Sequence, residues 1–115
     1  MNMRVTLVDY NAGNLLSVAR AFRHLGASVV LAESAKAIAA ADCLVLPGGG
    51  AFAACLDGLR RNGHEEAVRR HIEDGKPFLG ICVGMQMLFE ASDEFGSTTG
   101  MALFAGRVRA IPARD

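Results

Sequence analysis

The sequence has no tryptophan, one tyrosine, three prolines and no net charge, because 12 basic residues balance 12 acidic ones. The balanced charge gives no electrostatic reason to bind nucleic acid or an anionic membrane surface. The apolar runs are short, and the longest one stops at "PGGG", so none is long enough to cross a bilayer. We therefore expect neither a nucleic-acid partner nor a membrane partner.

The cysteine content excludes further classes of protein. Cys43, Cys55 and Cys82 form neither a CxxC pair nor a zinc-type spacing, so we expect no metal site and no cofactor. The start of the chain, "MNMRVTLVD", reaches an acidic residue too soon for a secretory signal. An odd number of cysteines without such a signal is typical of reduced thiols, so we expect a cytoplasmic protein. Cys43 and Cys55 have no functional context and are expected to be small core residues.

The remaining composition is that of an ordinary globular protein. Hydrophobic residues make up 51% and charged residues 21% of the 115 positions, and 13 positions are glycine. A chain of this length can bury a core of its own, and we see no repeat, low-complexity tract or linker. We therefore expect residues 1–115 to belong to a single domain.

Short apolar segments rich in β-branched residues alternate with segments of helical period. Strands are expected at 4–9, 27–32, 43–46, 78–81 and 107–111, helices at 15–25, from 35 onward, 52–61, 64–74 and 84–90, and a loop at 94–100. Asn14 and Ser34 are in position to cap the first two helices, and Gly26 to end the first. Because the strands are apolar on both faces, we predict an α/β fold with a parallel sheet between helices.

Functional groups in such a sheet collect at the carboxyl ends of its strands. Three unusual loops are expected at that edge: "DYNAGN" (Asp9–Asn14), "PGGG" (Pro47–Gly50) and "GICVG" (Gly80–Gly84). Their convergence on one edge is a stronger indication of a functional site than any one of them alone.

Cys82 stands between two glycines, where the fourth strand should turn into a helix. This arrangement resembles a nucleophile elbow in which cysteine replaces serine, because Gly80 and Gly84 leave room for a tight turn. The thiol would lie at a helix amino terminus, which favours the thiolate, and the N–H of Val83 would face a developing oxyanion. The alternative is a buried structural cysteine ahead of a methionine-rich core helix.

The glycine run "PGGG" can expose backbone N–H groups to an anion, although a plain turn explains it equally well by itself. It is neither a P-loop nor a dinucleotide-binding fingerprint, because the residues that those motifs require do not follow it. Beside a nucleophile elbow, a strand that stabilises an oxyanion becomes the better interpretation. The "DYNAGN" loop is expected to cap the following helix through Asn14 and to offer a polar surface to a partner.

A thiol nucleophile usually needs a histidine base, and the chain has three histidines. His24 and His71 lie near the ends of helices that should return to the amino edge of the sheet, opposite Cys82. His64 lies on the same return path among charged residues. We therefore expect all three to be solvated helix residues, and none of them to be the base for Cys82.

Together these motifs resemble those of the class I (triad) glutamine amidotransferases, and within them the glutaminase subunits of imidazole glycerol phosphate synthases from histidine biosynthesis. The family elbow G-[IV]-C-x-G-x-Q stands here as "GICVGMQ" (Gly80–Gln86), with the methionine that these subunits favour before the glutamine. Their opening strand and loop correspond to "DYNAGNLLSV" (Asp9–Val18), and their oxyanion strand to "PGGGAF" (Pro47–Phe52). The resemblance implies a flavodoxin-like wound sheet of mostly parallel strands with helices on both faces.

The resemblance also implies the chemistry. Cys82 would attack the side-chain amide carbon of glutamine, form a glutamyl thioester and release ammonia. The backbone N–H groups of Gly49 and Val83 would stabilise the oxyanion, once the Gly49 peptide turns toward it. Gly49 stands where the family more often has valine.

The other matching residues are implied in binding. Those implied to bind glutamine are Gly48, Gly50 and Gln86. Those implied to face the partner are Asn11, Gly13 and Asn14. The implied partner is the barrel-shaped synthase (cyclase) subunit of imidazole glycerol phosphate synthase, which receives the ammonia in a heterodimer.

The resemblance covers this chain but only the amino-terminal part of such a subunit. The family completes its triad with a histidine and a glutamate in an "HPE"-like motif, and these 115 residues contain no such motif. Because the members of a triad act as a unit, we expect negligible turnover from the chain alone. We also expect a sheet that is incomplete at its carboxyl end, with an unpaired edge on the last strand that favours self-association.

Two other interpretations stay open. The first is a glutaminase subunit of another amidotransferase, such as anthranilate or aminodeoxychorismate synthase, whose elbows usually place histidine before the glutamine. The second is a non-catalytic, flavodoxin-like binding domain. In that domain Cys82 would be structural, and "PGGG" would contact a phosphate or a protein.

Overall fold

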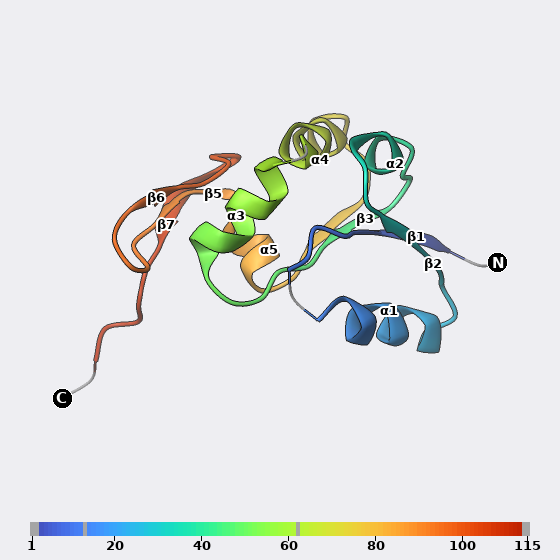
Figure 1. Cartoon of the computed structure of the whole chain (residues 1–115), viewed down its shortest axis with the longest axis horizontal. Helices are drawn as coiled ribbons and strands as arrows, with labels where there is room; N and C mark the ends of the chain where they lie inside the picture. Colours follow the sequence, from blue (N-terminus) through green and yellow to red (C-terminus); the bar gives the residue numbers. More distant parts are fainter. Residues whose placement is uncertain (1–2, 13, 62, 114–115) are drawn as a thin grey trace.

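The computed structural model describes residues 3–12, 14–61 and 63–113, and a four-stranded parallel sheet lies at its centre (Figure 1). The strand order is β2 (Ser28–Ala32), β1 (Arg4–Val8), β3 (Leu44–Leu46) and β4 (Phe78–Gly80). All three pairings are parallel, so the carboxyl ends of the strands share one edge. The predicted α/β fold is therefore confirmed.

The central strand β1 shows why this sequence forms a buried sheet. Val5 and Leu7 point to one face and pack with Val45, whereas Val8 belongs to the core on the opposite face. These side chains are almost completely buried, and Thr6 between them is buried as well. A strand covered on both faces needs this near-continuous apolar run, which is typical of parallel sheets.

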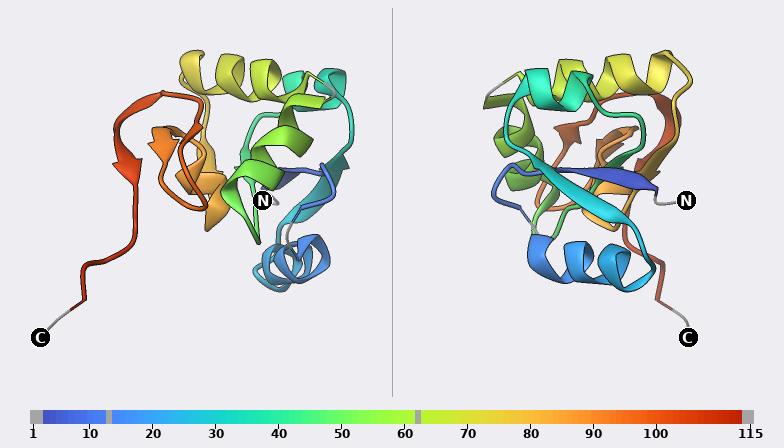
Figure 2. Two further views of the ribbon diagram at one scale, coloured as in Figure 1. Left: turned by 60° about the vertical axis from the view of Figure 1, so that its left-hand side comes forward. Right: turned by 90° about the vertical axis from the view of Figure 1, so that its right-hand side faces the viewer.

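Helices cover both faces of the sheet, as predicted, but unequally (Figure 2). Helix α1 (Leu15–His24) packs against one face, through contacts with Val5, Leu7 and Val45. The other face is covered by α2 (Ala35–Ala39), α3 (Phe52–Arg61) and α4 (His64–Glu73). The side-chain oxygens of Asn14 and Ser34 accept hydrogen bonds from the first turns of α1 and α2, so both predicted caps are confirmed.

The region after Cys82 differs from the prediction. Helix α5 (Val83–Gln86) is four residues long, and the segment expected to continue it to residue 90 is instead β5 (Phe89–Ser92). The loop expected at 94–100 contains β6 (Thr98–Thr99), and the strand expected at 107–111 is β7 (Phe104–Val108). These three strands form a second sheet in the order β6-β5-β7. Short apolar runs do not separate helix from strand by period, which is why the change at residue 89 was missed.

The second sheet lies beside α3 and α5, and it is tied to the first part of the fold through buried contacts (Figure 1). Met101, between β6 and β7, is buried in the same core as α3 and α4. Its carbonyl accepts a 2.7 Å hydrogen bond from the guanidinium of Arg69 on α4. A side chain at Gly100 would place its Cβ 2.2 Å from the carbonyl oxygen of Phe89, so only glycine allows this close approach.

Each sheet has two open edges among the described residues, at β2 and β4 in the first sheet and at β6 and β7 in the second. Strand β4 pairs only with β3, and β7 pairs only with β5. Beside the open edge of β4, Leu79 is 50% exposed, because α1 does not extend over this strand. An incomplete sheet was predicted from the sequence, but its open edges lie in two sheets and not only at the last strand. Self-association through them stays a prediction.

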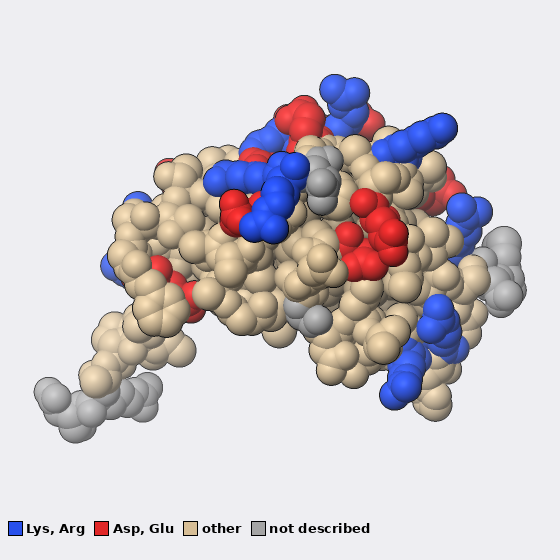
Figure 3. All heavy atoms as spheres, viewed as in Figure 1, with Lys and Arg blue, Asp and Glu red and all other residues tan. Residues whose placement is uncertain are grey.

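The described surface carries charges of both signs. Lys and Arg side chains alternate with Asp and Glu over α3 and α4, and the visible face has no large area of one sign (Figure 3). Within the described ranges, no helix combines the length and the apolar character that a membrane crossing requires.

Burial in the α3 core gives a first testable prediction. Replacing the completely buried Leu59 by alanine should lower the free energy of unfolding by about 2–5 kcal/mol, because it leaves a cavity. Leu25, after α1, is the matched control, since it is 80% exposed. Its replacement by alanine should change stability by less than about 0.5 kcal/mol. Urea unfolding measures both variants, and equal losses would contradict the difference in packing.

Candidate active site at a cysteine turn

The three predicted loops meet at the carboxyl edge of the sheet, as expected. The hydroxyl of Tyr10, in the loop after β1, donates a 2.5 Å hydrogen bond to the carbonyl of Pro47, in the loop after β3. The backbone N–H of Val83, after β4, donates to the carbonyl of Gly48 at 3.3 Å. The glycine loop 47–50 therefore lies between the other two loops and is bonded to both.

Cys82 occupies the sharp turn between β4 and α5. Its φ of 54° and ψ of −122° are unusual for a residue with a side chain, and such strain is typical of nucleophile elbows. The turn is closed by a 2.9 Å bond from the N–H of Gly84 to the carbonyl of Ile81. Cys82 is exposed, whereas Cys55 is buried and Cys43 is half-buried. Cys82 is therefore the most accessible of the three cysteines.

Two glycines let the cysteine turn and the glycine loop interlock. A Cβ on Gly84 would lie 1.9 Å from the carbonyl oxygen of Leu46, and a Cβ on Gly48 would lie 2.6 Å from the backbone nitrogen of Gly84. Gly80 is also confined, because its Cβ would lie 2.8 Å from the Cα of Met85. No side chain fits at any of these positions without moving the backbone, so the glycines hold the loop against the turn.

The two predicted oxyanion donors do not point to a common position in this structure. The N–H of Val83 is bonded to the carbonyl of Gly48, which lies where the oxyanion was predicted. The peptide between Gly48 and Gly49 is trans, so the N–H of Gly49 points away from that carbonyl. A turn of this one peptide by about half a revolution would exchange the carbonyl for the N–H.

Tyr10 and Cys55 contact the glycine loop, and neither of them was predicted as a site residue. The thiol of Cys55, on α3, lies 3.1 Å from the carbonyl of Gly49 and donates to it. Burial, with the Cys55 thiol close by, raises the pKa of Tyr10, so its hydroxyl stays protonated and remains a donor. One signal was available: a buried tyrosine needs a partner for its hydroxyl, and Tyr10 is the single tyrosine.

The residues implied in glutamine binding lie in different settings. Gly48 is buried under the turn, whereas Gly50 is exposed, with a φ of 88°. Gln86 is half-buried and lines a cavity of about 280 Å³, together with Ser92, Asp93 and Glu94 from the second sheet. Glu94 was not predicted as a site residue. Its carboxylate accepts a 2.9 Å bond from the N–H of Phe52, at the start of α3, and so links the second sheet to the end of the glycine loop.

Two of the residues implied in partner binding, Asn11 and Asn14, lie just before α1. Asn11 is exposed and has a φ of 62°, and Asn14 is exposed while its side chain caps α1. Gly13 lies outside the described residues. Asn11, Asn14 and the 63% exposed Leu16 line a surface cavity of about 400 Å³.

The prediction that all three histidines are solvated is wrong for two of them. His64 and His71 are buried, and each ring Nε2 hydrogen-bonds a backbone carbonyl, that of Glu33 at 3.0 Å and that of Pro77 at 2.8 Å. A buried ring nitrogen facing a carbonyl must carry the proton, so both rings act as internal donors. Only His24 is exposed, at the end of α1.

None of the three histidines lies beside Cys82. His71 contacts Pro77, just before β4, at the opposite end of the strand that leads to Cys82. His64 is at the carboxyl edge, contrary to expectation, because it bonds the residue after β2. However, β2 and β4 are the two outer strands of the sheet, three strand spacings or roughly 14 Å apart.

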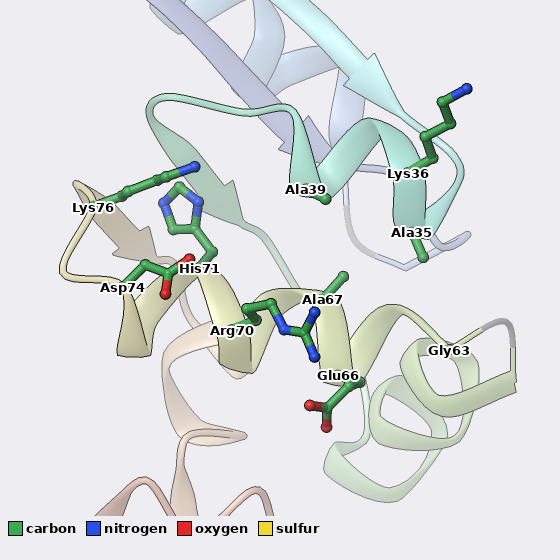
Figure 4. Close-up of a pocket in the computed structure, with 10 residues that line it drawn as sticks. All are labelled: Ala35, Lys36, Ala39, Gly63, Glu66, Ala67, Arg70, His71, Asp74 and Lys76. Atoms are coloured by element: carbon green, nitrogen blue, oxygen red, sulfur yellow. The ribbon is translucent and has the colours of Figure 1, made fainter.

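The cavity shown in Figure 4 does not mark the site. It measures about 350 Å³, lies between α2 and α4, and is lined by both signs of charge, including Lys36, Arg70 and Glu66. None of the predicted site residues lines it. The volume of a cavity therefore does not identify the candidate active site in this structure. In the described part of the chain, no cluster of His, Cys, Asp and Glu is arranged to hold a metal ion.

The structure is an α/β protein with a strained cysteine turn at the carboxyl edge of a parallel sheet, and comparison with known proteins identifies its family. Residues 9–110 match the CobB/CobQ-like glutamine amidotransferase domain, and the chain belongs to this family. The resemblance stated from the motifs is confirmed. Imidazole glycerol phosphate synthase subunit HisH of Thermus thermophilus is 48% identical over 98% of this chain and 56% of that protein. The subunit HisH of Syntrophotalea carbinolica is 45% identical over 94% and 52%.

The chain spans about half the length of the curated relatives that it matches. A solved structure described as a glutamine amidotransferase superimposes with a TM-score of 0.75 over 90% of this chain and 55% of the other. The two sequences are 20% identical, so this likeness bears on the fold alone.

The interlock gives a second testable prediction. Gly84→Ala should lower the free energy of unfolding by more than about 3 kcal/mol, because the new methyl group meets rigid backbone. Gly58→Ala on α3 is the control, since its Cβ would approach the carbonyl oxygen of Tyr10 only to 3.3 Å. There the better helix propensity of alanine, about 1 kcal/mol, offsets the contact. Thermal unfolding compares them, and equal stabilities would show that the loop and the turn are not interlocked.

Proposed function

We propose that this chain supplies the nucleophile half of a glutaminase, the HisH-type subunit of an imidazole glycerol phosphate synthase in histidine biosynthesis. The observation that carries the proposal is the exposed Cys82 on a strained turn, with the N–H of Val83 and the glycine loop directly beside it. The HisH relatives, 45% and 48% identical, support the choice among amidotransferases.

In the proposed reaction the sulfur of Cys82 attacks the side-chain amide carbon of glutamine. A carbon–sulfur bond forms, the carbon–nitrogen bond breaks, and the nitrogen leaves as ammonia after taking up a proton. Water then hydrolyses the thioester to glutamate and restores the thiol. The negative charge on the carbonyl oxygen would be stabilised by the N–H groups of Val83 and Gly49, after the Gly48–Gly49 peptide has turned.

Glutamine would bind between the glycine loop and the second sheet. Gln86 offers an amide, and Gly48 and Gly50 offer backbone groups without steric hindrance. Asp93 is paired with Arg107, which leaves Glu94 as the carboxylate near Gln86 that best suits the α-ammonium group of an amino acid.

The proposed partner is the barrel synthase subunit that consumes the ammonia, in a heterodimer. Asn11 and Asn14 follow β1 at the same edge as Cys82, so a partner bound there would lie close to the site of ammonia release. We also propose a cytoplasmic location, because the three cysteines are free thiols.

The proposed reaction needs a base from outside these 115 residues. His64 and His71 are buried donors to backbone carbonyls, and His24 is on the far end of α1. We therefore propose that residues 1–115 are the amino-terminal portion of a single glutamine amidotransferase domain, whose histidine and glutamate are not among them.

This proposal predicts the turnover of the chain. Ammonia release from glutamine, in the presence of the barrel synthase, should be at least about 10⁴-fold slower than for a complete subunit, because triad members act as a unit. A coupled glutamate dehydrogenase assay measures it, with Cys82→Ser as the background control. Turnover near that of a complete subunit would contradict the proposal. Co-purification with a chorismate-using synthase instead of the barrel would assign the chain to a different amidotransferase.

The proposal also predicts selective reactivity of Cys82. Under native conditions a chloroketone analogue of glutamine should alkylate Cys82 faster than Cys43, and the L-analogue should react faster than its D-isomer. Mass spectrometry of proteolytic peptides gives both rates, and excess glutamine should slow only the reaction at Cys82. Equal reactivity of the two cysteines would favour a non-catalytic, flavodoxin-like binding domain.

A further inference from the structure

We propose that Tyr10 and Cys55 are positioning residues, which hold the glycine loop so that the single peptide between Gly48 and Gly49 can turn and complete the oxyanion site. The inference rests on the proposed glutaminase function. Neither side chain touches the reacting atoms, and both would act through the backbone of the loop.

Three successive carbonyls of the loop have three different donors. The carbonyl of Pro47 is held by the hydroxyl of Tyr10 at 2.5 Å, and that of Gly49 by the thiol of Cys55 at 3.1 Å. The middle carbonyl, that of Gly48, has only the 3.3 Å bond from the N–H of Val83. The outer two peptides are therefore anchored by buried side chains, and the middle one only by a backbone N–H, at the longest of the three distances.

The residues of the middle peptide permit it to turn alone. When both neighbouring peptides stay fixed, a peptide turns by changing ψ of the residue before it and φ of the residue after it. Those residues are Gly48 and Gly49, and glycine accepts positive φ without steric cost. The anchors therefore do not oppose the turn. They confine it to one peptide, so less conformational entropy is lost when the oxyanion site forms.

Both anchors are themselves rigidly placed. Tyr10 is 7% and Cys55 3% exposed, and both belong to the main core cluster. Helix α3, which carries Cys55, begins at Phe52, whose N–H is held by Glu94 of the second sheet. The loop is thus held by one residue that follows β1 and by one residue of α3, and its middle peptide is bonded to the cysteine turn.

The consequence for the reaction is specific. Removing one anchor should lower the fraction of molecules in which the N–H groups of Gly49 and Val83 both face the oxyanion. The intrinsic nucleophilicity of the Cys82 thiol should be unaffected. A reagent that builds negative charge on a carbonyl oxygen needs the oxyanion site, and a simple alkylating reagent does not.

The test compares two reagents on the intact chain. The glutamine chloroketone forms a thioether with Cys82, chloride leaves, the thiol proton passes to the buffer, and charge develops on the ketone oxygen. Iodoacetamide alkylates the same sulfur by direct displacement of iodide. For each variant the measured quantities are the maximal rate of inactivation and the half-saturating concentration of chloroketone, and the iodoacetamide rate at Cys82.

Tyr10→Phe and Cys55→Ala should each lower the maximal chloroketone rate by about three- to tenfold, the effect of one hydrogen bond. The iodoacetamide rate should stay within about twofold, because direct displacement of iodide does not use the oxyanion site. Cys55→Ser should restore the rate, since the hydroxyl also donates, and Cys43→Ala is the matched control without effect. Circular dichroism and unfolding curves identify any variant that fails to fold, in which case Cys55→Ser against Cys55→Ala remains the decisive pair.

Unchanged chloroketone rates in the Tyr10 and Cys55 variants would overturn the proposal. Faster rates would overturn it as well, because they would mean that the two side chains hold the carbonyl of Gly48 against the N–H of Val83. A parallel fall in both reagents would indicate a merely structural role. If the wild-type chain shows no preference for the L-chloroketone, the glutaminase proposal itself fails, and this outcome is distinct from equal rates among variants.

Discussion

The close approach of the glycine loop to the cysteine turn is the constraint on which the rest of this structure depends. A Cβ on Gly84 would lie 1.9 Å from the carbonyl oxygen of Leu46, so the end of β3 and the start of α5 touch backbone to backbone. This contact places the N–H of Val83 against the loop and leaves Cys82 exposed on a strained turn. The strain is maintained because the surrounding strands and helices are well packed.

The remaining elements can be understood by how they hold this contact. The parallel sheet brings the three loops to one edge, α3 carries Cys55 to the carbonyl of Gly49, and the loop after β1 carries Tyr10 to the carbonyl of Pro47. The second sheet contributes Glu94, which fixes the start of α3. The buried histidines serve the fold in a similar way, since His64 and His71 tie α4 to backbone carbonyls at the two ends of the sheet.

Much of the fold was predictable because it depends on local signals. The caps at Asn14 and Ser34, the turn at Gly26 and the first four strands follow from side-chain chemistry and period. The second sheet was not predictable, because the apolar run Met87–Phe89 that leads into β5 fits a helix as well as a strand. The burial of His64 and His71 was missed for a related reason: a polar ring becomes a core residue only when a distant carbonyl is available to it.

The sequence by itself determined that three glycine-rich or polar loops follow parallel strands, and that Cys82 stands in an amidotransferase motif. These features depend on short segments, and the backbone geometry of each segment is set by its own residues. Only the tertiary structure decided that the carbonyl of Gly48 faces Val83, and that Tyr10 and Cys55 hold the peptides on either side of it. Those bonds join residues of different strands and helices, and no local pattern encodes the position of a donor that another part of the chain supplies.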